Sequence, residues 1–362
     1  MTATPAMTSN DPRDLDGKRL QLAMQTLGRD PALRARMIAL LRECEGQIAC
    51  AGSVRDEVVG PIIAALHLDT EQYDKVLADG TRFQFLYRTK IARDFLLSEA
   101  EHPTHVWEPQ TTKLLLELGR DLQGDVLVGG AYFGDQAVLV ARQLAGRDLK
   151  VHCFEPNPQQ AAMLQCNIDL NHLSNVVVNV AGLWSRSGER MRLDGFDSFA
   201  NMVSVQDGSG FDTVAMDDYA QRQGRRIGLI QLDIEGAELA ALQGAQQVLA
   251  RDKPHVVFEL HRTYVDWSHG LRATPLCRLL LDLGYTVYAV RDINSHREMP
   301  NQPVELVPLD SVYLDGPPHG FNMLAVPDAA RVQGSAFRIV EGVSPKLLPH
   351  KDPHLHHPVG GF

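Results

Sequence analysis

The sequence has no apolar run near the roughly 18 residues that a membrane-spanning helix needs, so an integral membrane protein is not expected. Its start, residues 1–12, has no apolar core of the secretory type, which favours a cytoplasmic protein. Basic residues are in the minority: 35 Lys and Arg stand against 45 Asp and Glu, a net charge of −10. Because nucleic acid phosphates need basic partners, we expect a protein that does not bind nucleic acid. The lack of a long apolar run likewise predicts no membrane partner.

Cysteine is also scarce, and its spacing matches no metal site. The five cysteines are an odd number, which predicts free thiols in a reducing compartment. Hydrophobic residues make up 44% of the 362 residues, which excludes a mostly disordered chain. The length favours two domains, or one large domain with an appendage.

Residues 1–104 read as an N-terminal helical region. Apolar residues recur at helical spacing in three segments, Ala32–Cys44, Val58–Leu66 and Phe83–Leu97, and no strand is predicted between residues 13 and 100. Such a region either closes over the remainder of the protein as a lid or buries its apolar stripes in a subunit contact. We therefore expect a homo-oligomer, most simply a dimer.

Residues 105–330 alternate between strand and helix patterns. The expected strands are 125–129, 150–154, 175–181, 227–232, 255–260, 285–290 and 322–326. The expected helices are 136–144, 158–170, 238–250 and 275–283. This order predicts an α/β fold with a doubly wound, mostly parallel seven-stranded sheet.

Residues 331–362 form a C-terminal tail. Its last part, residues 345–362, holds four prolines and four histidines, and proline opposes regular helices and central strands. We expect this end to be largely disordered, with an adventitious metal site or an interaction tail as the alternatives. Truncation after Ser344 is then expected to leave the melting temperature nearly unchanged.

Two features follow the first two predicted strands of the sheet. The first strand runs into a glycine-rich turn that contains Gly130, Ala131 and Gly134, where the backbone can approach a ligand closely. Glu155 ends the second strand, 21 residues after Gly134. An acidic side chain at this distance is placed to accept hydrogen bonds from ribose hydroxyls. Together the two features predict an adenosine-type cofactor.

Acidic residues also gather at the ends of the fourth and fifth strands. Asp233, Glu235 and Glu238 follow the fourth strand, and Glu238 is expected to cap the next helix. Glu259 and His261 point to one side at the end of the fifth strand. Crowded carboxylates are costly unless solvent, helix amides or a cation neutralises them, so function is favoured over packing at these positions.

The sequence resembles the FkbM-type S-adenosylmethionine-dependent methyltransferases over roughly Trp107 to Pro327. The motifs that carry the resemblance, in chain order, are Trp107-Glu108-Pro109, Gly130-Ala131 with Gly134-Asp135, Phe154-Glu155-Pro156-Asn157-Pro158, Asn167 with Asn171, Ala181-Gly182-Leu183-Trp184, Thr213 to Asp218, Leu232 to Glu238, Leu242-Gln243-Gly244-Ala245, Pro254 and Phe258-Glu259. The resemblance implies a Rossmann-like methyltransferase fold and S-adenosylmethionine as cofactor. It also implies an O-methyltransferase that acts on a small polar or sugar-bearing metabolite, as in natural product biosynthesis. The cofactor-binding residues are then expected to be Gly130, Ala131, Gly134, Glu155, Asn157, Asp233 and Glu235.

One motif departs from the family pattern. Where the family usually carries Asp, a hydrophobic residue and Gly-Ala-Asn, this chain has Val128, Gly129, Gly130, Ala131 and Tyr132. The departure leaves a non-catalytic cofactor-binding or scaffold protein as the alternative. A dinucleotide-dependent oxidoreductase is weaker, because the sequence lacks a Gly-x-Gly-x-x-Gly turn.

An alcohol is a poor nucleophile until it loses its proton, and two devices are open for this. His261 can serve as a general base, with Asp233 as the second catalytic residue. Alternatively, Asp233 and Glu259 can hold a divalent cation such as Mg²⁺ that lowers the pKa of the hydroxyl. A third interpretation has these carboxylates bind the cofactor's amino group or the acceptor directly.

Overall fold

The computed structural model describes residues 12–45, 47–48, 50, 54–68, 70–98, 100–194, 201–204, 210–314, 320–348 and 351–357. Its contacts divide the chain into two compact units. The first unit comprises Met1–Tyr73 with Leu86–Arg88, and the second comprises Asp74–Phe85 with Thr89–Phe362.

The first unit is mainly helical. Its elements are α1 (Pro12–Gly28), α2 (Pro31–Glu45), the π-helix η1 (Arg55–Val59) and α3 (Gly60–Ala65). A Cβ at Gly28 would lie 1.8 Å from the carbonyl oxygen of Leu66, so the end of α1 needs glycine there. Arg34 of α2 donates two hydrogen bonds to the Glu71 carboxylate, at 2.8 and 3.1 Å. Helix α2 covers the predicted segment 32–44, and η1 with α3 covers nearly all of segment 58–66, so both helical predictions are confirmed.

The prediction that residues 13–100 contain no strand was wrong. Strands β1 (Gln72–Val76) and β2 (Arg82–Leu86) form a two-stranded sheet, and only then does α4 (Lys90–Leu96) begin. Phe83 and Phe85 alternate with half-buried or exposed neighbours along β2, which is the period of a strand. The apolar residues of β2 and α4 together imitate one long helical stripe, and this explains the misreading.

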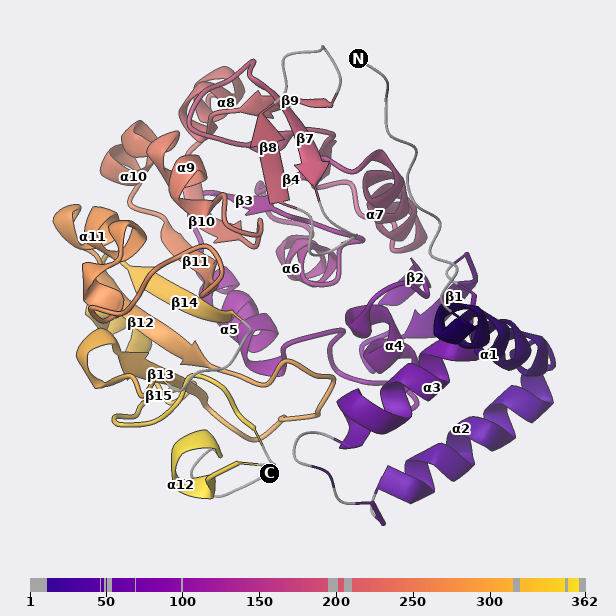
Figure 1. Ribbon diagram of the computed structural model, residues 1–362. Helices are drawn as coiled ribbons and strands as arrows, with labels where there is room; N and C mark the ends of the chain where they lie inside the picture. Colours follow the sequence, from indigo (N-terminus) through magenta and orange to yellow (C-terminus); the bar gives the residue numbers. More distant parts are fainter. Residues whose placement is uncertain are drawn as a thin grey trace, which may run out of the picture. The chain divides into compact units, whose positions relative to one another are not determined.

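The second unit is built on a nine-stranded sheet (Figure 1), with the order β15-β13-β12-β14-β11-β10-β3-β4-β5. The strands are β3 (Asp125–Gly129), β4 (Val151–Phe154), β5 (Val176–Asn179), β10 (Ile227–Leu232), β11 (His255–Leu260), β12 (Thr286–Arg291), β13 (Val304–Pro308), β14 (Phe321–Val326) and β15 (Phe337–Ile339). The five strands from β5 to β11 pair in parallel, whereas β14 runs antiparallel between β11 and β12.

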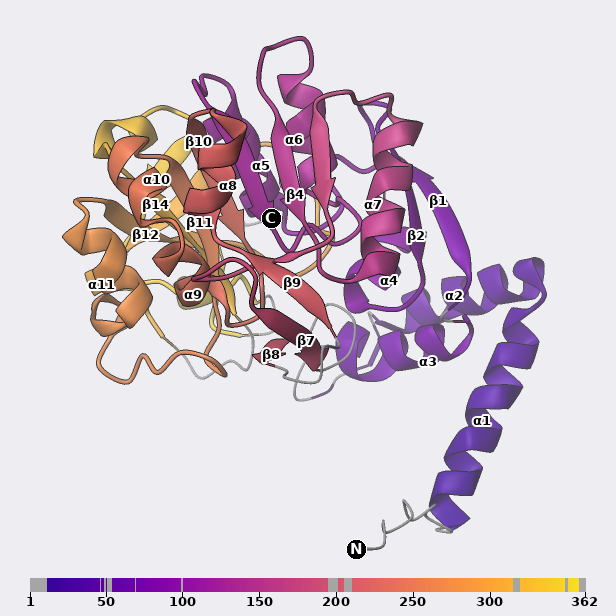
Figure 2. The same ribbon diagram turned by 90° about the horizontal axis from the view of Figure 1, so that it is seen from above.

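Helices cover both faces of this sheet, as the two views agree (Figures 1 and 2). One face carries α5 (Pro109–Gly119), α6 (Ala137–Leu144) and α7 (Pro158–Leu170). The other carries α8 (Met216–Gln223), α9 (Glu238–Gln243), α10 (Gln246–Arg251) and α11 (Pro275–Asp282). Buried apolar side chains from the strands, such as Ile230 and Phe258, pack with Leu242, Leu249 and Leu280 of the second helical layer. The chain thus has the predicted doubly wound α/β fold.

The sheet has two more strands at one edge than predicted. All seven expected strands are present, and β13 and β15 extend the sheet beyond β12. A separate four-stranded sheet, β6-β9-β7-β8, contains β6 (Gly182–Leu183), β7 (Arg190–Asp194), β8 (Asn201–Ser204) and β9 (Phe211–Val214). The expected helix 238–250 is two helices, because the chain turns at Gly244, where a Cβ would lie 2.2 Å from the Trp184 carbonyl oxygen.

The tail also differs from the prediction. Its described residues pack on the sheet: Leu347 is 1% exposed, and His356 of the short helix α12 (Pro353–His356) is 3% exposed. The buried Arg291 of β12 donates to the carbonyl oxygens of Ser344, Leu355 and His357. Docking of residues 344–348 and 351–357 contradicts a largely solvated tail, while residues 349–350 and 358–362 lie outside the described residues.

Truncation after Ser344 is now expected to lower the melting temperature. The change exposes the Leu347 site and removes two acceptors of Arg291, whose remaining partners are Ser344 and Glu305. Losing one buried leucine costs roughly 1.5–3 kcal/mol, and an under-bonded buried charged group costs a similar amount. At roughly 2–4 °C per kcal/mol for a domain of this size, we expect a fall of about 6 °C or more. Differential scanning calorimetry measures it, with the exposed His354→Ala as control; an unchanged value would show that the docked tail adds no stability.

Among the described residues, no helix is long and apolar enough to cross a membrane. All five cysteines are free thiols, as expected, and Cys153 and Cys277 are buried.

Candidate active site

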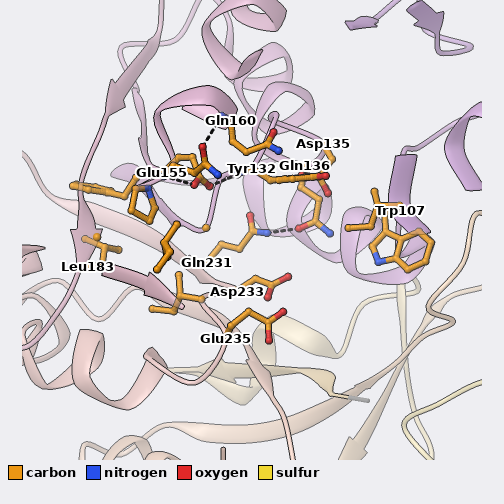
Figure 3. A pocket seen from close by; sticks show the side chains of 18 of the residues that line it. Trp107, Tyr132, Asp135, Gln136, Glu155, Gln160, Leu183, Gln231, Asp233 and Glu235 are labelled. Carbon is orange, nitrogen blue, oxygen red and sulfur yellow. Dashed lines mark hydrogen bonds between the residues drawn. The ribbon is translucent and has the colours of Figure 1, made fainter. Parts of the chain in front are cut away.

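A pocket opens at the carboxyl ends of β3, β4 and β10 in the second unit (Figure 3). The volume of this pocket, including the part that is open to solvent, is about 900 Å³. Its walls are Ile91, Trp107, Glu108, Gly130, Tyr132, Asp135, Gln136, Phe154, Glu155, Pro156, Asn157, Gln160, Gly182, Leu183, Leu193, Gln231, Asp233, Ile234 and Glu235. The carboxyl edge of a doubly wound sheet is where such folds bind ligands. Five of the predicted site residues line this pocket: Gly130, Glu155, Asn157, Asp233 and Glu235.

The glycine-rich turn brings β3 close to β10. Gly130 has φ +75°, and a Cβ there would lie 1.8 Å from the Asp233 carbonyl oxygen. Gly134, with φ +93°, packs against Leu164 and Val138. Ala131 and Gly134 do not line the pocket, so their contribution is to the shape of the turn rather than to its wall. The turn continues through Tyr132, a non-glycine residue at φ 48°, which costs backbone strain.

Glu155 is fixed by two backbone amides. Tyr132 N–H donates to its Oε2 at 2.9 Å, and Asn157 N–H donates to its Oε1 at 2.9 Å. Asn157 in turn caps α7 by accepting from the Gln159 N–H. Carboxylate oxygens are also the acceptors that a ligand diol would need. Leu183 is another part of the pocket wall and gives it an apolar surface (Figure 3).

Three carboxylates meet at the other end of the pocket. Ligand oxygens of Asp233, Glu235 and Glu259 all lie within 4.8 Å of one another, and the side chains of Asp233 and Glu235 point in the same direction (Figure 3). Glu235 has a left-handed backbone, φ 51°. Glu259 approaches the pocket only through this cluster, since it is not part of the wall. We name Asp233, Glu235 and Glu259 the carboxylate cluster.

The protein environment makes these groups weaker acids than usual. Solvent in the pocket reaches Asp233, but surrounding protein desolvates its carboxyl and raises its pKa to about 6. Burial, followed by the charge of Asp233, raises the pKa of Glu235 to about 7. Burial and the charges of Asp233 and Glu235 hold the pKa of Glu259 well above its usual range. The cluster therefore exchanges protons near neutral pH, where general bases work best.

His261 is arranged differently from the prediction. It lies after β11 but outside the pocket wall, and its Nδ1 accepts a hydrogen bond from the Thr263 N–H at 3.0 Å. A neutral imidazole that accepts at Nδ1 carries its proton on Nε2, so it has no free nitrogen to take another. This geometry argues against His261 as the general base.

The structure adds pocket residues that sequence patterns did not single out as site residues. Glu108, with φ 48°, is buried and accepts hydrogen bonds from Asn322 at 2.8 Å and Asn294 at 3.2 Å. Burial and the charge of Asp292 hold its pKa well above the usual range. Burial and then Asp233 raise the pKa of Asp135 to about 7. In the sequence, Glu108 and Asp135 stand out only as acidic residues within the family motifs Trp107-Glu108-Pro109 and Gly134-Asp135. An acidic side chain at a motif position is the signal that could have identified them.

Glu238 does not cap α9 as expected: the N-cap of α9 is Ala237, with no side-chain hydrogen bond, and Glu238 bonds the preceding turn instead. Its carboxylate accepts from the Ile234 N–H at 3.0 Å and the Gly236 N–H at 3.1 Å, so it holds the turn that presents the carboxylate cluster. Burial raises its pKa to about 8.

Stability of the ligand-free protein is expected to fall between pH 5 and pH 8. Asp135, Asp233 and Glu235 have pKa values of about 7, 6 and 7, above those of unfolded chains. The folded state then binds more protons than the unfolded state, so the free energy of unfolding decreases as pH rises through these values. Melting temperatures across this range measure the slope, which should flatten in Asp233→Asn/Glu235→Gln. A slope that is unchanged in this variant would show that other groups dominate.

The fold is of the Rossmann-like class, with a pocket at the carboxyl edge of the sheet and a cluster of acidic groups at one end of that pocket. Residues 129–287 match the family model of the methyltransferase FkbM domain, so this part of the chain is similar to that family.

Solved structures similar to this chain include methyltransferases. The FkbM methyltransferase of Methylobacillus flagellatus KT is 18% identical over 56% of this chain and 43% of its own, with a TM-score of 0.33. This chain therefore spans less than half the length of that protein. An O-methyltransferase of Thermotoga maritima is 12% identical over 74% of this chain and 80% of its own, with a TM-score of 0.32. An O-methyltransferase of Bacillus cereus, solved with S-adenosylhomocysteine, is 15% identical over 60% and 80%, with a TM-score of 0.34. No curated protein matches the chain.

Proposed function

We propose that this protein is an S-adenosylmethionine-dependent methyltransferase that acts on a hydroxyl oxygen of a small polar or sugar-containing metabolite in a biosynthetic pathway. The observation that carries the proposal is the carboxylate cluster, whose three oxygens lie within 4.8 Å of one another at the edge of the cofactor pocket. Transfer to an alcohol releases a proton, and a cluster of carboxyls with pKa values near 6 and 7 is suited to receive it.

The two ends of the pocket carry side chains that suit the two parts of S-adenosylmethionine. The Glu155 carboxylate lines the pocket, where it would accept from the ribose hydroxyls, and Leu183 with Ile234 offers apolar surface for the adenine. At Gly130 the turn approaches Asp233 so closely that a Cβ would collide with the Asp233 carbonyl oxygen. The usual family turn carries an Asp where this chain has Val128. Asp233 and Asp135 are therefore the acidic groups that would bind the ammonium of the methionine part. When bound, S-adenosylmethionine supplies an activated methyl group on a sulfonium sulfur.

The chain's own residues then have three tasks. Glu155 holds the nucleoside, and Gln231, which donates a hydrogen bond to Gln136, fixes the floor between the two ends of the pocket. Trp107 is part of the pocket wall (Figure 3), where its bulk would limit water. The carboxylate cluster orients the acceptor hydroxyl in line with the methyl group and takes its proton. With the cofactor bound, transfer to a hydroxyl would yield a methyl ether and S-adenosylhomocysteine, and the carboxylate cluster would hold the proton that the hydroxyl releases.

The cluster also fits a divalent cation. Oxygen-only ligands suit Mg²⁺, and Asp233 with Glu259 would hold it, aided by Glu235. A Mg²⁺ ion there would lower the pKa of a bound hydroxyl.

A methyl-transfer assay tests the proposed function. The full-length protein is incubated with S-adenosylmethionine carrying a labelled methyl group and a panel of polyols, glycosides, amines and thiols. We expect labelled ethers from hydroxyl acceptors only, and methylated amines or thiols as the sole products would overturn the proposal. Repeating the assay after chelation separates the two modes of the cluster: activity that is lost and restored by Mg²⁺ indicates a bound cation, whereas surviving activity indicates a direct base.

A further inference from the structure

Two glutamines, Gln136 and Gln231, line the pocket between Glu155 and the carboxylate cluster (Figure 3). Gln231 lies on β10, two residues before Asp233. Gln136 is the N-cap of α6 and its side chain makes no capping hydrogen bond. Instead, the two side chains are joined to each other, because Gln231 Nε2 donates to Gln136 Oε1. The pair therefore spans the pocket floor from β10 to the start of α6.

This hydrogen bond uses only half of each amide group. Within the described part of the chain, Gln136 Nε2 and Gln231 Oε1 have no hydrogen-bond partner. The two residues are only 6% and 8% exposed, yet neither of these atoms is enclosed by protein. A polar group at so buried a position is costly unless water or a ligand bonds to it. The pair thus presents one NH₂ donor and one carbonyl acceptor to the space of the pocket.

The charge of the pocket indicates which ligand group needs the NH₂ donor. As far as the described residues form it, the wall carries five carboxyl groups and no lysine, arginine or histidine; the five belong to Glu108, Asp135, Glu155, Asp233 and Glu235. Such a wall attracts an ammonium or a sulfonium and repels a carboxylate. The amino-acid part of S-adenosylmethionine carries an ammonium and also a carboxylate. That carboxylate therefore needs a donor, and no basic side chain of this wall supplies one.

We propose that Gln136 and Gln231 bind the amino-acid end of the cofactor, with the NH₂ of Gln136 donating to the α-carboxylate. This inference rests on the proposed function, since it requires S-adenosylmethionine or S-adenosylhomocysteine in this pocket. The carbonyl oxygen of Gln231 would accept from the ammonium, together with Asp135 and Asp233. Gln136 also begins α6, and the partial positive charge at the N-terminus of a helix favours a carboxylate there.

Isothermal titration of the full-length protein with two ligands tests this assignment. One ligand is S-adenosylhomocysteine, and the other is its analogue in which hydrogen replaces the α-carboxylate while the amine remains. Gln136→Glu keeps an oxygen that accepts from Gln231 and replaces only the NH₂ by a second, negatively charged oxygen. We expect this variant to bind S-adenosylhomocysteine roughly tenfold more weakly or worse, because two carboxylates then meet. It should bind the analogue at least as tightly as the unchanged protein does.

Two further variants separate the donor from the charge. Gln136→Met removes the NH₂ without adding charge, so S-adenosylhomocysteine should bind roughly tenfold more weakly and the analogue within about twofold of the unchanged protein. Gln247→Glu makes the same chemical change as Gln136→Glu at an exposed position of α10, and it should change neither affinity.

The outcomes distinguish this inference from the proposed function. Equal losses for both ligands in the Gln136 variants, or no loss for either, would overturn the inference alone. If the unchanged protein binds neither ligand, the proposed function fails and the inference fails with it. Should the Gln136 variants not fold, a crystal structure of the unchanged protein with S-adenosylhomocysteine decides. A carboxylate in hydrogen-bond contact with Gln136 Nε2 supports the assignment, and a carboxylate held by other groups refutes it.

Discussion

Replacing Asp233 by asparagine is expected to slow methyl transfer by roughly 100-fold or more, the range in which a positioned proton acceptor contributes to rate. Asn keeps the shape of the side chain and removes its charge. Asp233 borders the pocket and belongs to the carboxylate cluster, so the cluster loses this member whether it acts as a base or holds a cation. Because burial raises its pKa to about 6, the unsubstituted residue is largely ionised at pH 7 and can take a proton.

The measurement is single-turnover kinetics with the acceptor found in the labelled-methyl assay. Glu259→Gln should slow the reaction in the same direction, whereas the exposed Asp282→Asn at the end of α11 is the matched control and should not change it. His261→Ala should cost less than Asp233→Asn, because His261 Nδ1 is occupied by the Thr263 N–H. Melting temperatures of all variants show that they fold. Full activity in Asp233→Asn and Glu259→Gln would refute a role of the cluster in catalysis.

The pH profile of the same reaction gives a second readout. With Asp233 at about 6 and Glu235 at about 7, the rate should rise with pH through this range as the carboxyls lose their protons. This direction is opposite to that of the stability, which falls over the same range because the folded state gives up protons there. The ionised cluster therefore promotes the reaction but lowers the stability of the ligand-free fold.

Elements that are buried on both faces could be predicted from the sequence. Strands β3, β10 and β11 begin and end at the predicted residues, because parallel strands covered by helices read as continuous apolar runs. Helix α7 also has its predicted bounds, since Asn157 caps it and Pro158 occupies its first turn. The position of Glu155 followed from its spacing, because a strand, a turn and a helix of ordinary length fix where the next strand ends.

The remaining features depend on contacts between distant residues, which no local pattern records. Glu108 meets Asn294 and Asn322, which lie 186 and 214 residues further along the chain. The tail docks because buried Arg291 needs acceptors, and the carbonyl groups of Leu355 and His357 supply them irrespective of side-chain type. The occupied Nδ1 of His261 is likewise a property of the turn at Thr263 and not of strand alternation.

Glu155→Ala is expected to weaken binding of S-adenosylhomocysteine by roughly 10- to 100-fold. A hydrogen bond to a charged group is worth roughly 1.5–3 kcal/mol, and about 1.4 kcal/mol corresponds to a tenfold change in affinity. The side chain also accepts from the N–H groups of Tyr132 and Asn157, so its removal loosens the turn as well as the ribose contact.

A comparison of two ligands separates these effects of Glu155→Ala. Isothermal titration with S-adenosylhomocysteine and with its analogue lacking both ribose hydroxyls gives four dissociation constants, one for each protein and ligand. If Glu155 binds the ribose, the substitution weakens S-adenosylhomocysteine strongly and the analogue little, because the analogue has no hydroxyl to lose. The unsubstituted protein should likewise bind the analogue more weakly than S-adenosylhomocysteine. Equal losses for both ligands would mean that Glu155 only supports the turn between Tyr132 and Asn157, and that the ribose is held by another part of the pocket.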